Sequence, residues 1–397
     1  MTDPATRRVM DAMAAAGIGA RFVGGCVRNA LIGRGVDDID IAVDRAPDLV
    51  MPALAAAGLK VVPTGLKHGT VTAVSNHKPY EITTLRRDVE TDGRHAVVAF
   101  TDDWRVDAER RDFTMNAMSA DLDGRLWDYF DGRADLAAGR VRFVGDADTR
   151  LDEDVLRLLR FFRFHAWYGQ PPFDAEGMAA CRRAVGRLAA LSAERVRNEL
   201  LKLLAAPEPA DTVTAMATIG ALDRWLPEFT DAGALRHLRA LGPERDGLVG
   251  LATILPAGAD ATTIGKRLKL STQQALRLET MLTAAAPLDV GDPTAVRRDV
   301  YRLGNALYRD RLLVEAARAG TRPGDRVLAG ALSIAATWKA PEPPVRGSDA
   351  LAAGIKAGPV VGTLVAGVEA WWIDRDFAPD RAACLAELRR RVAALPS

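Results

Sequence analysis

Two hydrophobic patterns divide the chain. In the first third, runs such as HGTVTAVS at 68–75 and YEITTLR at 80–86 alternate apolar and polar residues, which is typical of paired β-strands. Helical spacing separates these runs. From about residue 137 only helical spacing remains, as in DEDVLRLLRFFRFHAW and SAERVRNELLKLLAA. The pattern predicts an α/β head with a mixed β-sheet and helices, followed by an all-α remainder.

Glycine and proline mark the interruptions between these elements. The segment RDVETDGRHAVVAF at 87–100 is polar and contains glycine, so we expect a mobile loop there. Weaker breaks in the helical part fall near 207–209 and 256–260, and KAPEPPVRG at 339–347 makes a stronger one.

Composition narrows the class of protein. The 397 residues are 48% hydrophobic and 26% charged, which is typical of a soluble globular protein. The net charge is only +1, so any contact with nucleic acid must come from local basic faces. The three cysteines fit neither a disulfide framework nor a zinc site. No apolar run reaches the ~18 residues of a membrane span, and we expect a cytoplasmic protein without a membrane partner.

The stretch VDDIDIAVD at 36–44 places acids in what otherwise looks like a buried strand. Side chains two apart share one face of a strand, so Asp38 and Asp40 are expected to project together. Two such carboxylates repel unless a cation lies between them, and Mg²⁺ suits oxygen ligands and phosphate substrates. Glu81, on a neighbouring strand, offers a third carboxylate. The alternative is a polar strand edge whose acids only face solvent.

A glycine pair precedes this stretch. Gly24 and Gly25 lie between a predicted strand and a short helix, where backbone N–H groups can approach a triphosphate. Arg28 follows one turn later and is placed to reach the same anion. The simpler interpretation of the glycines is a tight turn.

Together these residues resemble a known signature. VGGCVRNALIGRGVDDIDIAV is similar to the signature of the nucleotidyltransferase superfamily, and Arg28 narrows the resemblance to class II, the tRNA CCA-adding enzymes and bacterial poly(A) polymerases. The CCA-adding branch is favoured. Asn29 departs from the pattern, because the family usually has aspartate there. Further similar motifs follow in order over the first half of the chain: RRDFTMNA at 110–117, DYFDGRADL at 128–136, EDVLR at 153–157 and SAERVRNEL at 192–200.

The resemblance implies a domain order and a set of site residues. It implies a catalytic head at 1–136, a nucleotide-selecting neck at 137–205, a helical body at 206–330 and an RNA-binding tail at 331–397. It implies Mg²⁺ as cofactor, with Asp38, Asp40 and Glu81 as catalytic residues and the first two as metal ligands. The loop around 92–94 would move as the site switches from C to A. The expected nucleotide-binding residues are Gly24, Gly25, Arg28, Arg111, Asp112, Asn116, Asp154, Arg157, Arg160 and Arg163.

Within this set, two residues have the chemistry to select a base. Asp154 and Arg157 are three apart, which would place them on one helix face. A carboxylate accepts and a guanidinium donates, which matches the amino group and ring acceptors of cytosine and adenine. Uracil and guanine would meet the opposite pattern and be rejected. The alternative is a helix-stabilising ion pair worth ~0.3 kcal/mol.

The resemblance predicts the addition of C, C and A to the 3′ end of tRNA from CTP and ATP. A poly(A) polymerase shares this chemistry, but GLKHGTV at 65–71 differs from the basic element expected of that class. Enzymes that add only CC or only A share the same head. A non-catalytic RNA-binding protein is disfavoured by the intact acid pair.

Overall fold

The computed structural model describes residues 1–91, 96–242 and 245–395. The chain forms two compact units, one of Met1–Phe229 with Arg267–Lys269 and the other of Thr230–Lys266 with Leu270–Ser397. Within the described ranges, no helix is long and apolar enough to cross a membrane.

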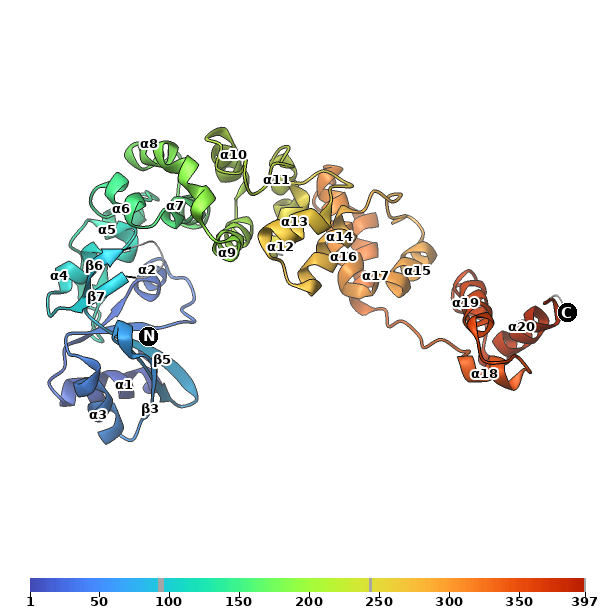
Figure 1. Cartoon of the computed structure of the whole chain (residues 1–397), viewed down its shortest axis with the longest axis horizontal. Coiled ribbons are helices and arrows are strands. Elements are labelled where there is room, and N and C mark those ends of the chain that lie inside the picture. Colours follow the sequence, from blue (N-terminus) through green and yellow to red (C-terminus); the bar gives the residue numbers. More distant parts are fainter. Residues whose placement is uncertain (92–95, 243–244, 396–397) are drawn as a thin grey trace. The chain divides into compact units, whose positions relative to one another are not determined.

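The first unit begins with a mixed sheet, drawn in blue and cyan in Figure 1. Seven strands form it in the order β3-β4-β5-β2-β1-β8-β9, while β6 and β7 pair with each other as a separate ribbon. Strands β2 and β5 run parallel, and the other neighbours run antiparallel. The strands are β1 (Ala20–Val23), β2 (Asp40–Val43), β3 (Lys60–Gly65), β4 (Thr70–Ser75), β5 (Lys78–Thr84), β6 (Arg86–Thr91), β7 (Ala96–Phe100), β8 (Ser119–Ala120) and β9 (Leu126–Trp127).

Helices make up nearly all of the rest, as the sequence pattern predicts. In the first unit they are α1 (Pro4–Ala15), α2 (Gly25–Leu31), α3 (Pro47–Ala56), α4 (Trp104–Glu109), α5 (Gly132–Ala137), α6 (Ala147–Glu153), α7 (Leu156–Tyr168), α8 (Ala175–Ala184), α9 (Ala193–Leu204) and α10 (Ala210–Thr218), with 3₁₀ turns η1 (Leu66–His68), η2 (Thr114–Asn116) and η3 (Val185–Ala190). In the second unit they are α11 (Gly233–Leu241), α12 (Gly247–Thr253), α13 (Ala261–Leu268, whose last two residues belong to the first unit), α14 (Thr272–Leu282), α15 (Pro293–Leu303), α16 (Asn305–Arg318), α17 (Arg326–Thr337), α18 (Gly347–Ala352), α19 (Pro359–Ile373) and α20 (Arg381–Ala393).

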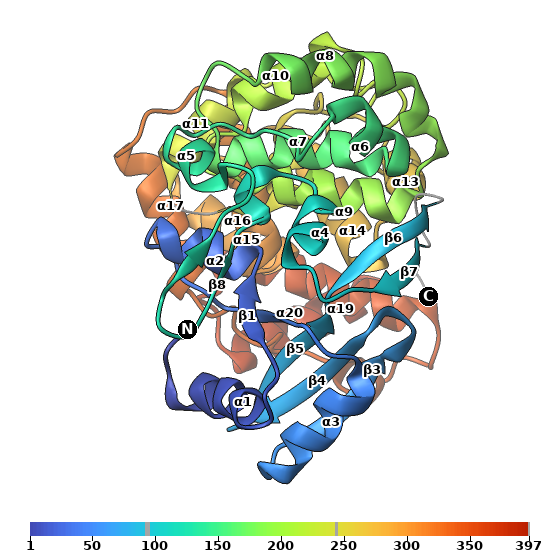
Figure 2. The same ribbon diagram turned by 90° about the vertical axis from the view of Figure 1, so that its left-hand side faces the viewer.

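The two faces of the sheet have different roles. Helices α1 and α3 pack on the sheet near β3 and β4, at the bottom of Figure 2. Along β5, Tyr80 and Ile82 are buried, and the Tyr80 hydroxyl lies 3.0 Å from that of Thr6 on α1. Because side chains alternate along a strand, Glu81 points to the opposite face. Asp40 pairs in parallel register with Glu81, so both acids belong to the face that α1 leaves open.

A cluster of phenylalanines joins the segment after α4 to helix α7. Phe113 lies 5.0 Å from Phe143 and 5.1 Å from Phe164, measured between ring centroids. Phe143 in turn stacks on Phe161 at 5.5 Å. All four rings are buried. Helix α7, which carries Phe161 and Phe164, is therefore packed against the segment that follows α4.

Hydrophobic clusters hold the described helices of the second unit together. The first forms around Val300, Tyr308 and Leu312 of α15 and α16. The second forms around Val368 and Trp372 of α19, with Tyr301 of α15 packed against it. The helices after the proline-rich segment therefore pack against α15 through Tyr301.

Some predicted boundaries differ from the structure. The described parts of 87–100 lie in the strands β6 and β7 and not in a loop, because AVVAF at 96–100 pairs with the strand at 86–91. The borders predicted after 136 and 330 fall inside α5 and α17, and the border after 205 follows the end of α9. The division into head, neck, body and tail stays a prediction.

Candidate active site

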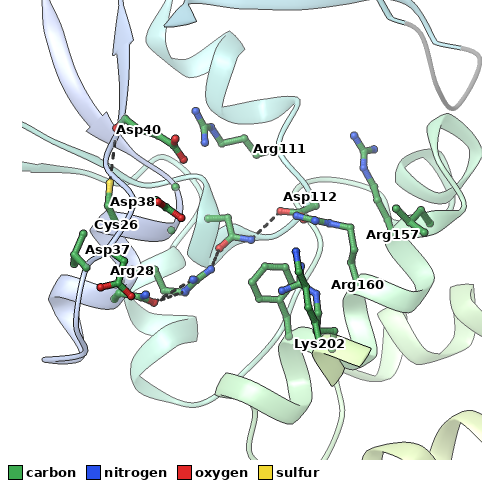
Figure 3. A pocket seen from close by; sticks show the side chains of 18 of the residues that line it. Cys26, Arg28, Asp37, Asp38, Asp40, Arg111, Asp112, Arg157, Arg160 and Lys202 are labelled. Atoms are coloured by element: carbon green, nitrogen blue, oxygen red, sulfur yellow. Dashed lines mark hydrogen bonds and ion pairs between the residues drawn. The ribbon is translucent and has the colours of Figure 1, made fainter. Parts of the chain in front are cut away.

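A pocket of about 750 Å³ lies within the first unit. Figure 3 shows Asp38 and Asp40 at one end and Arg157 at the other, with Arg111 and Asp112 between them. The residues predicted to bind the nucleotide all line it: Gly24, Gly25, Arg28, Arg111, Asp112, Asn116, Asp154, Arg157, Arg160 and Arg163. Segments that lie far apart in the sequence therefore meet here.

Asp38 and Asp40 line one end of this pocket, and both are exposed to solvent. The sequence analysis placed both on one strand, which is wrong for Asp38, because β2 begins at Asp40. Partial burial of the Asp40 carboxyl raises its pKa. Arg111 opposes this increase, and repulsion by Asp38 adds to it. Glu81 does not line the pocket, but it is the register partner of Asp40 on β5.

These acids have limited capacity to hold a metal alone. Among the residues that the structure describes, no three histidine, cysteine, aspartate or glutamate side chains lie close enough together to hold an ion. Asp38 and Asp40 remain as two carboxylates that line the same pocket. This arrangement fits a cation that takes its other ligands from water and substrate, as Mg²⁺ does.

The glycine turn lies between two guanidinium groups. Gly24 has φ +71°, and a Cβ atom there would lie 3.0 Å from Nη1 of Arg111. A Cβ atom on Gly25 would lie 3.5 Å from Nη2 of Arg28. Glycine is required at position 24 by its backbone conformation and by this close approach. The backbone of the glycine turn and the positive charges of Arg28 and Arg111 therefore lie on the same side of the pocket.

Arg111 is held in place by a buried acid that the sequence analysis did not identify. Asp107 of α4 accepts hydrogen bonds from Arg111 Nη2 at 3.2 Å, from Arg110 Nε at 2.9 Å and from the backbone N–H of Arg86 at 3.2 Å. Burial alone would raise the pKa of Asp107, but Arg111 and Arg110 outweigh it and hold that pKa below its usual value. Asp107 therefore connects the base of the β6–β7 ribbon to the pocket.

Asp112 is buried and its acceptor sites are filled. One oxygen accepts from Asn116 Nδ2 and from the N–H of Phe113, both at 2.9 Å. The other accepts from Nε of Arg160 at 2.7 Å and from its Nη2. A carboxylate has about four acceptor positions, so a ribose hydroxyl would have to displace one of these donors. The predicted nucleotide contact of Asp112 stays a prediction, and the bonds present position Asn116 and Arg160.

The acid and the arginine proposed to select the base do not share a helix face, contrary to the sequence analysis. Asp154 ends α6 in an extended conformation, and α7 begins only at Leu156. Arg157 pairs with Glu153, and Asp154 pairs with Arg195 of α9 at 2.6 Å. A direct ion pair between Asp154 and Arg157 is therefore absent among the described contacts, yet both residues line the pocket.

The pocket is also lined by eight residues to which the sequence analysis gave no role. Arg195 belongs to the SAERVRNEL motif, in which the sequence analysis assigned no site residue. Lys202 lies two turns further along α9 and had no motif to mark it. The predicted moving loop at 92–94 lies outside the residues that the structure describes. The eight residues are Cys26, Asn29, Val36, Asp37, Leu156, Phe164, Arg195 and Lys202.

Parts of the chain match models of known protein families. Residues 20–142 match the family described as "Poly A polymerase head domain". Residues 173–232 match "Probable RNA and SrmB-binding site of polymerase A". The two matches contain the glycine turn, the acids and the RRDFTMNA segment, but not the EDVLR motif.

Relatives cover more of the chain. CCA tRNA nucleotidyltransferase 1 of Mus musculus, described as mitochondrial, is 33% identical over 369 residues, which are 89% of this chain and 82% of the relative. The Danio rerio protein of the same name is 39% identical over 260 residues, 64% of this chain and 60% of that protein.

A solved structure agrees with these sequence matches. The crystal structure of the Bacillus stearothermophilus CCA-adding enzyme in complex with CTP is 27% identical, with a TM-score of 0.80 and 98% of each chain covered. It supports the mixed sheet followed by helices as the fold of this chain. The chain therefore belongs to the class II nucleotidyltransferases, in the family of the CCA-adding enzymes.

Proposed function

We propose that this chain adds C, C and A to the 3′ end of tRNA, using CTP and ATP and releasing pyrophosphate. The observation that carries the proposal is the convergence of three chemistries in one cavity of about 750 Å³. These are a carboxylate pair, a glycine turn between two guanidinium groups, and a separate acid and arginine at the far end. In an RNA-binding protein without catalytic activity, the exposed carboxylate pair would only repel the phosphates of the RNA.

Mg²⁺ is the proposed cofactor, and Asp38 and Asp40 are its proposed ligands. When bound, the ion supplies charge stabilisation at the α-phosphate and at the attacking oxygen. Glu81 lies beside Asp40 in the strand register, where it orients or deprotonates the 3′-hydroxyl of the primer. Arg28 and Arg111 then hold the triphosphate from the two sides of the glycine turn.

Base selection is assigned to Asp154 and Arg157. Three N–H groups of Arg157 are used by Glu153 and by the carbonyl groups of Arg150 and Arg110. Within the described contacts, Nε–H and one Nη2–H remain as donors. They can donate to acceptors on the base, which are N3 and O2 on cytosine and N1 on adenine. Glu153 pairs with Arg157, and Arg195 pairs with Asp154.

The remaining assignments concern the RNA and the cell. We assign the helices beyond residue 331 to the tRNA, which they would hold by its backbone and shape. We keep the cytoplasm as the proposed location. Partner proteins are not assigned.

One experiment separates this function from its relatives. The full chain is incubated with Mg²⁺, labelled NTPs and four primers: a tRNA without its 3′ CCA, one ending in C, one ending in CC, and an unstructured RNA. We expect the three tRNAs to be completed to CCA and the unstructured RNA to be a poor primer. A long A tract on every RNA would indicate a poly(A) polymerase, and products that stop at CC or require CC would indicate a partial enzyme. No incorporation at all would contradict the proposal.

A further inference from the structure

Arg28 is a buried cation whose hydrogen-bond partners are all uncharged. Only 7% of the residue is exposed. Its Nη1 donates to Asn116 Oδ1 at 2.5 Å, and its Nη2 donates to the Tyr168 hydroxyl at 2.9 Å. Nε and Nη2 also donate to Asn29 Oδ1, at 3.2 and 3.1 Å. Among the described ion pairs, none joins Arg28 to a carboxylate.

The other arginines on this side of the pocket are paired. Arg111 contacts Asp107, Arg160 contacts Asp112, and Arg163 contacts Glu199 at 2.5 Å. Each of those positive charges is balanced within the protein. Arg28 is the exception in this group, although it is the most buried of the four.

This arrangement carries an energetic cost. Burial lowers the pKa of Arg28 and Arg163 contributes to the decrease. Tyr168, whose ring lies 4.1 Å from the guanidinium carbon, and the charge of Asp112 oppose it. Arginine still remains protonated in proteins. Asp112 is paired with Arg160 and makes no ion pair with Arg28 among the described contacts. A full positive charge is therefore held in a buried place without a directly paired carboxylate, which destabilises the folded chain.

The position of the charge indicates what would compensate it. Nη2 of Arg28 lies 3.5 Å from the place where a Cβ atom on Gly25 would be. The guanidinium group thus lies beside the glycine turn and lines the pocket. An anion bound at that turn would be the missing countercharge.

Asn29 determines whether this countercharge comes from the protein. Its Oδ1 lies within hydrogen-bond distance of two Arg28 nitrogens, where an aspartate of the same shape would place a carboxylate oxygen. Its Nδ2 donates to the carbonyl of Gly35 at 3.4 Å, a bond that a carboxylate cannot make. We propose that the Asn29 amide keeps the charge of Arg28 available to the triphosphate of the incoming nucleotide, which makes Asn29 a positioning residue for nucleotide affinity. This inference rests on the proposed function.

The test is Asn29→Asp in the full chain, with Ala30→Asp as the matched control. Ala30→Asp adds the same carboxyl group one residue further along, at an exposed position. Binding of CTP and of inorganic triphosphate is measured by calorimetry with Mg²⁺, and Tm is measured without nucleotide. For Asn29→Asp we expect a higher Tm, and about tenfold weaker binding of both ligands because a charge-assisted contact is lost. The KM for CTP and ATP should rise more than kcat changes, and Ala30→Asp should alter affinity far less.

A third variant separates charge from shape. Asn29→Ser removes the amide without adding charge, so it should weaken binding less than Asn29→Asp does. Equal losses in both variants, unchanged affinity in Asn29→Asp, or a lower Tm in Asn29→Asp would each overturn the inference. If the wild-type chain itself binds neither CTP nor triphosphate, the proposed function fails instead, which is a distinguishable result.

Discussion

The variant Asp154→Asn tests whether the Asp154 side chain selects the base. The change keeps the shape of the side chain and converts one acceptor oxygen into a donor. In the structure, Oδ1 accepts from the N–H of Leu156 at 3.1 Å and Oδ2 accepts from Arg195 at 2.6 Å. Each carboxylate oxygen has two acceptor positions, so each retains one for the amino group of cytosine or adenine.

The expected size of the effect follows from this geometry. A hydrogen bond to a charged acceptor contributes roughly 1.5–3 kcal/mol. The side chain of Asp154 is 24% exposed and already shared with Arg195, so we take the lower end. About 1.5 kcal/mol corresponds to roughly tenfold weaker discrimination of C from U and of A from G. The ion pair with Arg195 is partly exposed, and its loss should cost about 0.5–1 kcal/mol of stability.

The assay is kcat/KM for all four NTPs on a tRNA without its 3′ CCA, together with Tm. Arg195→Gln is the matched control, because it breaks the same ion pair and leaves the carboxylate in place. We expect the two variants to lower Tm similarly, by about 2–4 °C per kcal/mol. Only Asp154→Asn should strongly change the C:U and A:G ratios. Unchanged ratios, or equal changes in both variants, would mean that Asp154 only supports the fold.

Three shorter predictions concern other parts of the pocket. Asp40→Asn should abolish transfer while tRNA affinity survives, which single-turnover kinetics and filter binding would measure together; normal turnover would refute the metal assignment. Gly24→Ala should raise the KM for CTP and ATP, because φ is +71° and the new Cβ would lie 3.0 Å from Arg111; an unchanged KM would contradict the phosphate role of this turn. The lowered pKa of Asp107 means that its carboxylate stabilises the fold above the unfolded value near 3.8, and that this contribution is lost as pH falls through the lower folded value. Asp107→Asn should therefore lower Tm at pH 7 and flatten the dependence of Tm on pH in acid, and parallel curves for the two proteins would contradict this.

The sequence was sufficient where the chemistry depends on local spacing. Gly24, Gly25 and the acids Asp38 and Asp40 lie within one stretch, and they meet in one pocket. Glu81 required one further step, since its position beside Asp40 depends on the parallel pairing of β2 with β5. The mixed head and helical remainder also followed from periodicity alone.

The sequence predictions were wrong where one local pattern is compatible with two different structures. Asp154 and Arg157 have helical spacing, but an aspartate side chain can accept from a backbone N–H two residues later and so end one helix and start another. The ribbon of β6 and β7 was not predicted, because its first strand is polar and was interpreted as a loop. Lys202 could not have been assigned from sequence, because only tertiary packing brings it to the pocket.

The phenylalanine cluster has a consequence for how this protein can be divided. Phe113 lies before the sequence border at 136, and Phe143, Phe161 and Phe164 lie after it. A gene fragment that ends at 136 would encode the acids and the glycine turn, but it would leave Phe113, which is fully buried in the whole chain, without the rings that cover it. Exposed aromatic surface of this kind promotes aggregation. A soluble minimal catalytic fragment must therefore extend through α7, and heating should unfold the sheet and this helix in a single cooperative transition.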